Sequence, residues 1–312
     1  LFSLALAIAP DSADTYNNRA TAFHEIKKFK EALNDCDKAI CLQPGYAEAF
    51  YNRGIVLKSL KNFNEAAKDF TQAIKYRSDY HSAYNNRGII FFELGNLKAA
   101  IDDYNMAIAL KANDQEFFNN RGIAFYELGQ WEKALADFNK AISLKHNYGE
   151  AFNNRGNVFL ELRRFKEALA DYNKTISIWP DCSDAINNRG TVYQKLERYE
   201  DALRDFNQAL KLNPSSNKVL NNRGNTFKRL GRYEESILDY NKALSFDINQ
   251  AEVINNRGLS REQLSQHTEA IADYDKAISI KPDYAEPYFN KSLQMLLLGN
   301  FAEGWPLYEW RW

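Results

Sequence analysis

The sequence predicts an all-α solenoid, a row of stacked helical hairpins, and three observations point to this fold class. The string NNRG, or a close variant of it, recurs every 34 residues without an insertion. Each repeat contains two stretches of apolar residues with helical periodicity, separated by a short break. The alternation of apolar and polar residues that marks half-buried strands is absent. We therefore expect residues 1–312 to form a single solenoid without β-strands.

The period sets the boundaries of the predicted repeats, and a place within a repeat is numbered from its first residue. Complete repeats begin at residues 13, 47, 81, 115, 149, 183, 217 and 251, and residues 285–312 form an incomplete ninth repeat or a C-terminal junction. Residues 1–12 match the end of a preceding repeat, because Leu6 and Pro10 stand at places 28 and 32. We therefore expect the native protein to extend upstream of Leu1.

Small residues recur where the two helices of a predicted hairpin cross. Place 8 is glycine in most repeats, and alanine recurs at places 20 and 27. Small side chains allow helix axes to approach each other closely, and the aromatic residue at place 24 then fills the remaining gap. A glycine such as Gly95 also supplies the turn between the helices, because glycine tolerates a positive φ. The place-8 glycines are Gly54, Gly88, Gly122, Gly156, Gly190, Gly224 and Gly258.

These places match the pattern of the tetratricopeptide repeat family, which the whole chain resembles. The pattern has a large residue at place 4, glycine at 8, aromatics at 11 and 24, alanine at 20 and 27, and proline at 32. Members form right-handed superhelices in which places 2, 5, 6, 9, 12 and 13 of the first helices line a concave groove. The resemblance implies a right-handed superhelical solenoid that binds a protein or peptide in an extended conformation.

Asparagine at place 6 is the candidate ligand-binding feature. A side-chain amide is both a donor and an acceptor, so it can match the N–H and C=O of an extended peptide. The row resembles the asparagine ladder of O-linked N-acetylglucosamine transferases. The alternative is structural, because asparagine also bonds nearby backbone, and place 5 is asparagine in seven of nine repeats. The predicted peptide-binding residues are Asn18, Asn52, Asn86, Asn120, Asn154, Asn188, Asn222 and Asn256, with Phe92 and Tyr126.

Other predicted groove residues change character along the chain. Repeats two to five carry an apolar strip that includes Ile123 beside Phe92 and Tyr126, whereas packing against the next hairpin is the alternative for these aromatics. Acidic residues accompany the strip, and basic residues replace them in repeats six and seven. We expect a ligand with basic and acidic segments flanking an apolar centre, the alternative being that these charges are merely solvated. The basic residues are Lys195, Lys218, Lys228 and Arg229.

Arginine at place 7, where the family usually has leucine, predicts a structural ion pair. Aspartate stands at place 23 in the first eight repeats, and both residues change in the ninth, to Lys291 and Leu307. Their joint change favours a pair within one repeat, although a pair between successive repeats also fits. Such pairs fix geometry more than they add stability. Examples are Arg87 with Asp103 and Arg121 with Asp137.

Composition and motifs argue against several other functions. The net charge of −1 lacks the basic excess that a nucleic-acid or anionic-membrane surface needs, and no apolar run reaches the about 20 residues of a membrane span. Three cysteines without CxxC spacing indicate reduced thiols, hence a cytoplasmic protein, and no histidine cluster suggests a metal site. No phosphate-binding loop or catalytic triad pattern occurs, so we expect neither an enzyme nor a cofactor.

The C-terminal segment carries three of the five tryptophans, namely Trp305, Trp310 and Trp312. A solenoid that ended here would be expected to present a polar cap. The segment instead resembles the junction at which bacterial tetratricopeptide arrays lead into a glycosyltransferase-like domain. Two alternatives to a free-standing scaffold follow. The chain could be the substrate-targeting arm of a larger bacterial glycosyltransferase, or it could assemble end to end through its aromatic last helix.

Overall fold

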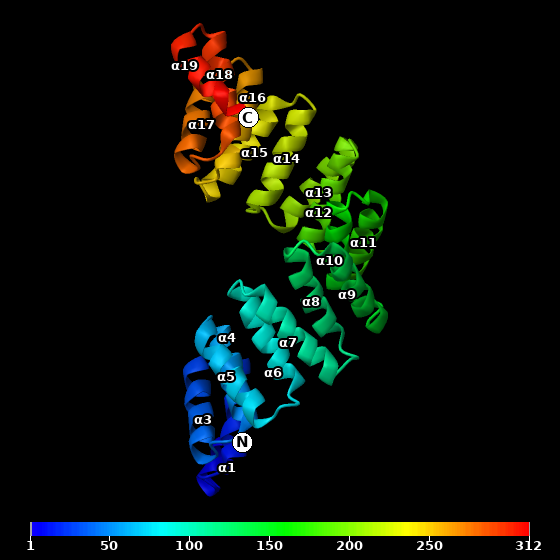
Figure 1. Cartoon of the computed structure of the whole chain (residues 1–312), viewed down its shortest axis with the longest axis vertical. Helices are drawn as coiled ribbons and strands as arrows, with labels where there is room; N and C mark the ends of the chain where they lie inside the picture. The colour runs from blue at the N-terminus through cyan, green and yellow to red at the C-terminus, as the bar shows by residue number, and fades with distance from the viewer. Residues whose placement is uncertain (1, 312) are drawn as a thin grey trace. The chain divides into compact units, whose positions relative to one another are not determined.

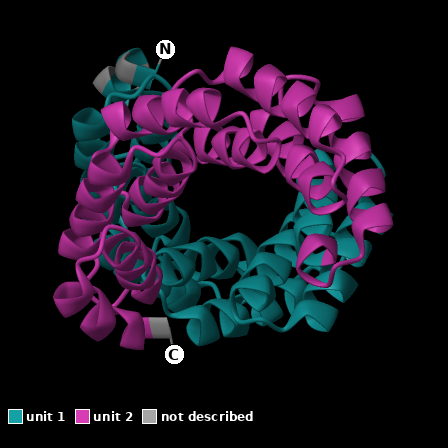
Figure 2. Ribbon diagram, turned by 90° about the horizontal axis from the view of Figure 1, so that it is seen from above, with its two compact units in different colours: residues 1–158 teal, residues 159–312 magenta. Residues whose placement is uncertain are grey.

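The structure is a computed structural model that describes residues 2–311, and every regular element in that range is a helix (Figure 1). Leu1 and Trp312 lie outside the described residues, as do the side chains of residues 3, 5, 7 and 311. The chain forms two compact units, residues 1–158 and 159–312, shown in teal and magenta in Figure 2. The predicted all-α fold is confirmed.

Unit 1 consists of helical hairpins preceded by the short helix α1 (Phe2–Ile8). Each first helix begins at a residue where the 34-residue period starts a repeat. The hairpins are α2 (Ala13–Glu25) with α3 (Phe29–Leu42), α4 (Ala47–Ser59) with α5 (Phe63–Tyr76), α6 (His81–Glu93) with α7 (Leu97–Leu110), and α8 (Gln115–Glu127) with α9 (Trp131–Leu144). Helix α10 (Gly149–Glu161) contains the boundary between the units.

Unit 2 continues with the same alternation of 13-residue first helices and 14-residue second helices. Its elements are α11 (Phe165–Ile178), α12 (Ser183–Lys195), α13 (Tyr199–Leu212), α14 (Asn217–Arg229), α15 (Tyr233–Phe246), α16 (Ala251–Gln263) and α17 (His267–Ile280). The last hairpin pairs α18 (Ala285–Leu297) with the shorter α19 (Phe301–Tyr308), and a 3₁₀ turn, η1 (Glu309–Arg311), follows.

The place-8 glycines lie where each hairpin is packed most tightly. A Cβ atom added to Gly122 would stand 2.7 Å from Cε1 of Phe138, and one added to Gly88 would stand 2.7 Å from Cε1 of Tyr104. Ala134 at place 20 is fully buried beside this contact. The aromatic ring at place 24 therefore occupies the space that a side chain at place 8 would need, as the sequence pattern predicted.

The turn between the two helices of a hairpin uses a left-handed residue at place 15. Gly95 has φ 76°, and its N–H donates to Phe92 O at 2.9 Å, which closes the end of the first helix. Five repeats place a residue with a Cβ in the same conformation, with φ between 56° and 60°. Glycine therefore identifies only some of these turns in the sequence. The five residues are Lys27, Lys61, Arg163, Glu197 and Ser265.

Within each unit the first helices lie beside one another, and this arrangement sets the position of the candidate site. Helix α4 contacts α2 and α6, and α6 contacts α8 in unit 1. In unit 2, α14 contacts α12 and α16, and α16 contacts α18. Places 5, 6, 9 and 12 of successive repeats therefore meet on one surface, which we call the first-helix surface of each unit.

Candidate functional site

The two asparagine rows of the first-helix surface are hydrogen-bonded to each other across repeats. The place-6 amide nitrogen donates to the place-5 amide oxygen of the preceding repeat, 35 residues earlier. In unit 1 the Nδ2–Oδ1 distances are 2.8 Å for Asn52 to Asn17, 3.0 Å for Asn120 to Asn85 and 3.1 Å for Asn154 to Asn119. In unit 2 they are 3.0 Å for Asn222 to Asn187, 3.5 Å for Asn256 to Asn221 and 3.0 Å for Asn290 to Asn255.

Four place-5 asparagines, Asn85, Asn119, Asn187 and Asn255, are buried and bonded at both ends of the amide, which indicates a structural role. Asn119 is fully buried, and its Nδ2 donates to Glu150 Oε1 at 3.0 Å while its oxygen accepts from Asn154. Asn85 makes the same kind of contact with Glu116, at 3.4 Å. A buried amide with all its partners supplied by neighbouring repeats has little left to offer a ligand.

The place-6 asparagines keep more of their hydrogen-bonding capacity. Asn52, Asn120, Asn154 and Asn222 are half-buried, and Asn18 is exposed. Within the described residues, no hydrogen bond reaches Oδ1 of Asn120 or Asn154. The bond from Nδ2 to the preceding repeat fixes the orientation of each amide, so its oxygen stays in a defined position as an acceptor.

Asn86 differs from its neighbours because place 5 of the preceding repeat is Tyr51. Nδ2 of Asn86 donates to the Tyr51 hydroxyl at 3.1 Å and to Ser82 O at 3.0 Å, and its Oδ1 accepts from Lys58 Nζ at 2.5 Å. Only 8% of Asn86 is exposed. Both the nitrogen and the oxygen of the Asn86 amide are therefore hydrogen-bonded within the protein. Asn188 is equally buried, and its Oδ1 accepts from Asn187 at 3.2 Å.

A small pocket joins Asn154 to one of the two predicted aromatic contacts. The pocket has a volume of about 130 Å³ and lies between α8 and the unit 1 part of α10. We call it the Asn154 pocket, and it is lined by Ile123, Tyr126, Glu127, Phe138, Asn154 and Asn157. Phe92 does not line it; this ring packs against the buried cluster of Ala100, Tyr104 and Ala124. Phe92 thus packs on a buried cluster and Tyr126 borders a pocket, and contact of either ring with a ligand stays a prediction.

Two further pockets on the first helices have the same relation to a place-6 asparagine. One of about 200 Å³ in unit 1 is lined by Asn52 together with Thr21, His24 and Ile55. Another of about 450 Å³ in unit 2 is lined by Asn256 together with Lys195, Lys228 and Arg229. Pockets thus recur between neighbouring first helices beside a place-6 asparagine.

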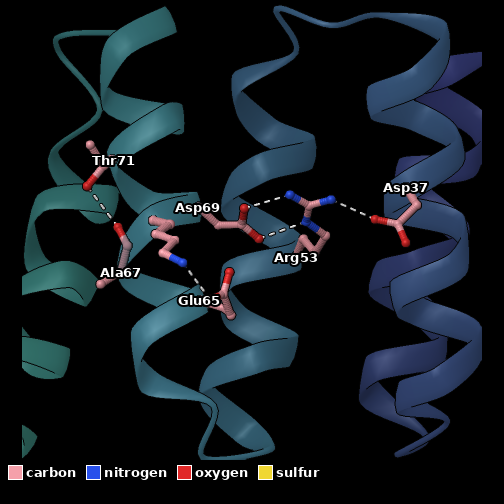
Figure 3. Close-up of polar contacts among 7 residues, drawn as sticks. Asp37, Arg53, Glu65, Ala67, Asp69 and Thr71 are labelled. Carbon is pink, nitrogen blue, oxygen red and sulfur yellow. Dashed lines mark hydrogen bonds and ion pairs between the residues drawn. The ribbon is translucent and has the colours of Figure 1, made fainter.

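The place-7 arginines line none of these three pockets, and Arg53 shows how such an arginine links three helices. Arg53 lies between Asp69 of its own repeat and Asp37 of the preceding repeat (Figure 3). Nε and Nη2 bond the two oxygens of Asp69 at 2.8 and 2.7 Å, and Nη1 bonds Asp37 at 2.6 Å. Hydrogen bonding to Asp69 raises the pKa of the Arg53 guanidinium, which stays charged.

The same fork recurs at the predicted pairs. Nη2 of Arg87 lies 2.7 Å from Asp103, and Nη2 of Arg121 lies 2.7 Å from Asp137. The third nitrogen reaches place 25 of the preceding repeat, Asn105 in the case of Arg121. Sequence reasoning named the aspartates and missed the place-25 partners, which vary among Asp, Asn and Thr. In the ninth repeat Lys291 keeps only this contact between repeats, to Asp275 at 2.6 Å.

The C-terminal tryptophans lie in different environments. Trp305 is 57% exposed, whereas the ring of Trp310 stacks on Tyr288 with centroids 4.0 Å apart. Trp312 lies outside the described residues.

Two observations concern membrane spans and metal sites. None of the described helices is long and apolar enough to cross a membrane. The described residues also contain no group of three or more His, Cys, Asp or Glu side chains placed to hold a metal ion.

Stacked hairpins tied together by recurring polar contacts define the chain as a helical-repeat scaffold. The family model described as "Tetratricopeptide repeat" matches residues 13–46, 47–80, 149–182, 183–216, 218–249 and 251–284, and a second, described as "TPR repeat", matches 89–129 and 124–163. The matches cover more than half of the chain, which therefore belongs to the tetratricopeptide repeat family. Such repeats are typical of scaffolds for protein–protein interaction and are generally not catalytic.

Solved structures with the same fold share little sequence with the chain. A chain of the APC/C hetero-tetramer Cut9–Hcn1 is similar with a TM-score of 0.69 and 15% identity, over 92% of this chain and 56% of that one. This chain thus spans little more than half of that relative. A tetratricopeptide repeat protein from Parabacteroides merdae has a TM-score of 0.64 and 20% identity, over 80% of this chain and 98% of that one. The pilF protein of Pseudomonas aeruginosa has a TM-score of 0.60 and 17% identity, over 68% of this chain and 96% of that one. A search of curated proteins gives no significant match.

Proposed function

We propose that the first-helix surface of unit 1 binds an extended polypeptide, with Asn120 and Asn154 accepting hydrogen bonds from its main-chain N–H groups. The observation that carries the proposal is the state of the Asn154 amide. Its nitrogen is bonded to Asn119, its oxygen has no hydrogen-bond partner among the described residues, and it borders a pocket. A fixed acceptor beside a pocket suits a peptide whose backbone is read by the amide and whose side chain enters the pocket.

The energetics require the pocket as well as the amides. Each amide–backbone hydrogen bond contributes about 1 kcal/mol net, and ordering a flexible peptide takes back about 2–5 kcal/mol. Two asparagines alone therefore cannot hold a peptide at micromolar concentration. An apolar side chain placed against Ile123 and Tyr126 adds about 25 cal/mol for each Å² that it buries. Selectivity then comes from the pocket, because a backbone contact is the same for every sequence.

The charges beside the pocket favour a ligand with basic residues next to its apolar side chain. Glu127 lines the pocket and is exposed, and Glu116 and Glu150 are exposed on the same first-helix surface. Exposed carboxylates attract a lysine or arginine of the ligand, mainly through the rate of association at low salt. An acidic peptide would be repelled from this surface.

Binding by variants tests the proposal. Peptides selected from a random 12-residue library against the full chain, then measured by fluorescence anisotropy, should bind the Asn120→Ala/Asn154→Ala variant at least tenfold more weakly. The matched control is Asn64→Ala/Lys140→Ala, which changes two exposed side chains of second helices and should bind like the native chain. Selected peptides that bind all three proteins equally would refute the proposed site.

The exposed C-terminal aromatics favour a second candidate, end-to-end self-assembly. Trp305 is 57% exposed and Phe301 is 60% exposed. Light scattering over a hundredfold range of concentration tests self-assembly, and a constant monomer mass would exclude it.

The proposed peptide-binding surface could also serve as the substrate-targeting arm of a larger, bacterial and cytoplasmic glycosyltransferase. Reading the native frame past Trp312 tests that role.

A further inference from the structure

Unit 2 contains a polar pocket whose chemistry is opposite to that of the Asn154 pocket. We call it the Lys228 pocket; it has a volume of about 450 Å³ and is lined by side chains near the ends of α12 and α14 and along α16. Polar and charged residues form its lining, which comprises Gln194, Lys195, Glu197, Tyr199, Asn225, Lys228, Arg229, Glu252 and Asn256.

The cations of the pocket have no carboxylate partner within the described residues. Neither Lys195, Lys228 nor Arg229 forms an ion pair within 4.0 Å, and the nearby Lys218 reaches only the amide oxygen of Asn188, at 3.5 Å. Other basic residues of unit 2 do find acids; Arg232, for example, pairs with Glu235. These three cations form no ion pair with the described residues and outnumber the two carboxylates of the lining, Glu197 and Glu252, so the pocket has an excess of positive charge.

Lys228 is held in the pocket instead of extending into water. Its Nζ donates to Asn256 Oδ1 at 2.9 Å, and the side chain is half-buried. Burial, and to a smaller extent the charge of Arg229, lowers the pKa of Lys228 to about 8, whereas Glu286 and Glu252 oppose this shift. A cation that is partly removed from water without a counter-ion gains more from an arriving anion than an exposed lysine does.

A fixed amide donor adds to the cations. Asn225 Oδ1 accepts from the hydroxyl of Tyr240 at 2.7 Å, and Tyr240 is fully buried, so the amide is anchored on the core. Its Nδ2 has no hydrogen-bond partner among the described residues and belongs to a side chain that lines the pocket. The neighbouring Gln194 is oriented in turn by Nε2–Oγ1 bonding to Thr226 at 3.0 Å. Charged and neutral donors thus surround one volume.

We infer that the Lys228 pocket binds a carboxylate of an acidic polypeptide segment, with Lys228, Arg229 and Asn225 as its donors. The lining contains three cations and the exposed carboxylates Glu197 and Glu252, so its charge suits a monoanion better than a doubly charged phosphate. This site goes beyond the proposed function, because it assigns a second ligand chemistry to the other unit and requires neither Asn120 nor Asn154.

Fluorescein-labelled octapeptides on the full chain test the inference. A peptide of alternating Glu and Ala should bind at least tenfold more tightly than its Gln/Ala and Lys/Ala counterparts, and at least as tightly as a phosphoserine/Ala peptide. The Lys228→Met/Arg229→Gln variant should lose at least tenfold in affinity for the Glu/Ala peptide. The control Lys211→Met/Lys242→Met removes two exposed lysines of α13 and α15 and should bind normally.

The pH dependence of peptide affinity gives a second readout, which a purely structural role of Lys228 would not produce. Because the lowered pKa leaves Lys228 uncharged above about pH 8, native affinity for the Glu/Ala peptide should fall between pH 7 and pH 9. Lys228→Met should bind weakly with no such fall. The charged and titratable groups around Lys228 are Lys195 on α12, Glu197 after it, Tyr199 on α13, Arg229 on α14, Glu252 on α16 and Glu286 on α18.

Several outcomes would overturn the inference. Equal binding of the Glu/Ala and Gln/Ala peptides would do so, as would native affinity in Lys228→Met/Arg229→Gln. Tighter binding of the phosphoserine peptide would replace the carboxylate by a phosphate. If the double variant melts early by circular dichroism, Lys195→Met, at the exposed end of α12, takes its place with an expected loss of at least threefold. Asn154→Ala should bind the Glu/Ala peptide normally, which separates this site from the proposed function.

Discussion

At the scale of single residues, burial separates the roles of two adjacent asparagines, Asn119 and Asn120. Asn119 is fully buried and bonded at both ends of its amide. Asn120 is half-buried, and only its nitrogen is engaged within the described residues. The first residue orients the place-6 amide of the following repeat, and the second has an oxygen to offer. Because Asn119 is buried and Asn120 is half-buried, the first asparagine positions a neighbouring amide and the second is a candidate for contact with a ligand.

The difference predicts unequal effects on stability. Asn119→Ala leaves the Asn154 nitrogen and the Glu150 carboxylate without a partner and should lower the free energy of unfolding by about 1–3 kcal/mol. Asn120→Ala removes one half-buried bond and should cost about 0.5–1 kcal/mol. Urea unfolding followed by circular dichroism measures both. Equal losses would show that the place-5 residue is not the structural member of the pair.

The arginine fork predicts a second asymmetry. Asp137→Ala leaves the Arg121 guanidinium, one-fifth exposed, without its charged partner and should cost about 3 kcal/mol. Arg121→Met/Asp137→Leu replaces both groups by apolar ones and should stay within about 1 kcal/mol of the native chain. Peptide affinity should survive in the double variant. If the double variant folds normally but no longer binds the selected peptides, the fork takes part in recognition.

At the scale of the helical hairpin, one glycine and one aromatic ring set how closely two helices approach. A Cβ on Gly122 would meet the Phe138 ring at 2.7 Å, and Gly190 and Phe206 repeat the contact at 2.8 Å in unit 2. The Phe138 ring is fully buried, and a separation of 2.7 Å is shorter than an ordinary contact of a Cβ atom. A methyl group must therefore displace a helix or a ring.

Gly122→Ala should lower the free energy of unfolding by about 1–3 kcal/mol, as overpacking of a close contact does. Gly45→Ala is the matched control, because a Cβ there stands 3.6 Å from the Tyr76 ring, an ordinary contact. Urea unfolding of the two variants compares them directly. A Gly122→Ala protein as stable as the native chain would mean that the hairpin tolerates a wider crossing.

Hairpin-scale features differ in how far the sequence predicts them. The 34-residue period, the place-8 glycines and the arginine–aspartate pairs follow from residue types that recur at fixed places. The left-handed turns at Lys61 and Ser265 leave no such mark, because the repeat imposes a φ of 58° on residues with a side chain. The asparagine–asparagine bonds were also missed. Their signal is a 35-residue spacing between the two rows, which only a structure distinguishes from coincidence.

At the scale of the whole molecule, the net charge is only −1, yet the two units have surfaces of different charge and polarity. The first-helix surface of unit 1 presents exposed glutamates beside an apolar pocket, and the Lys228 pocket of unit 2 presents three unpaired cations. Both pockets have side chains at places 6, 9, 12 and 13 of neighbouring repeats in their lining. We therefore expect ligands to contact both units at these places, and we expect the variable places 9, 12 and 13 to determine which ligand chemistry each unit accepts.

The most direct test of the proposed main-chain contact changes one atom of the ligand. In a library-selected peptide, each backbone N–H is replaced in turn by an ester oxygen, and affinity is measured for the native chain and for Asn154→Ala. We predict that one ester position weakens native binding about fivefold, the equivalent of about 1 kcal/mol, and has no effect on Asn154→Ala. Esters that leave native binding unchanged at every position, or that weaken both proteins equally, would contradict recognition of the peptide backbone by this asparagine.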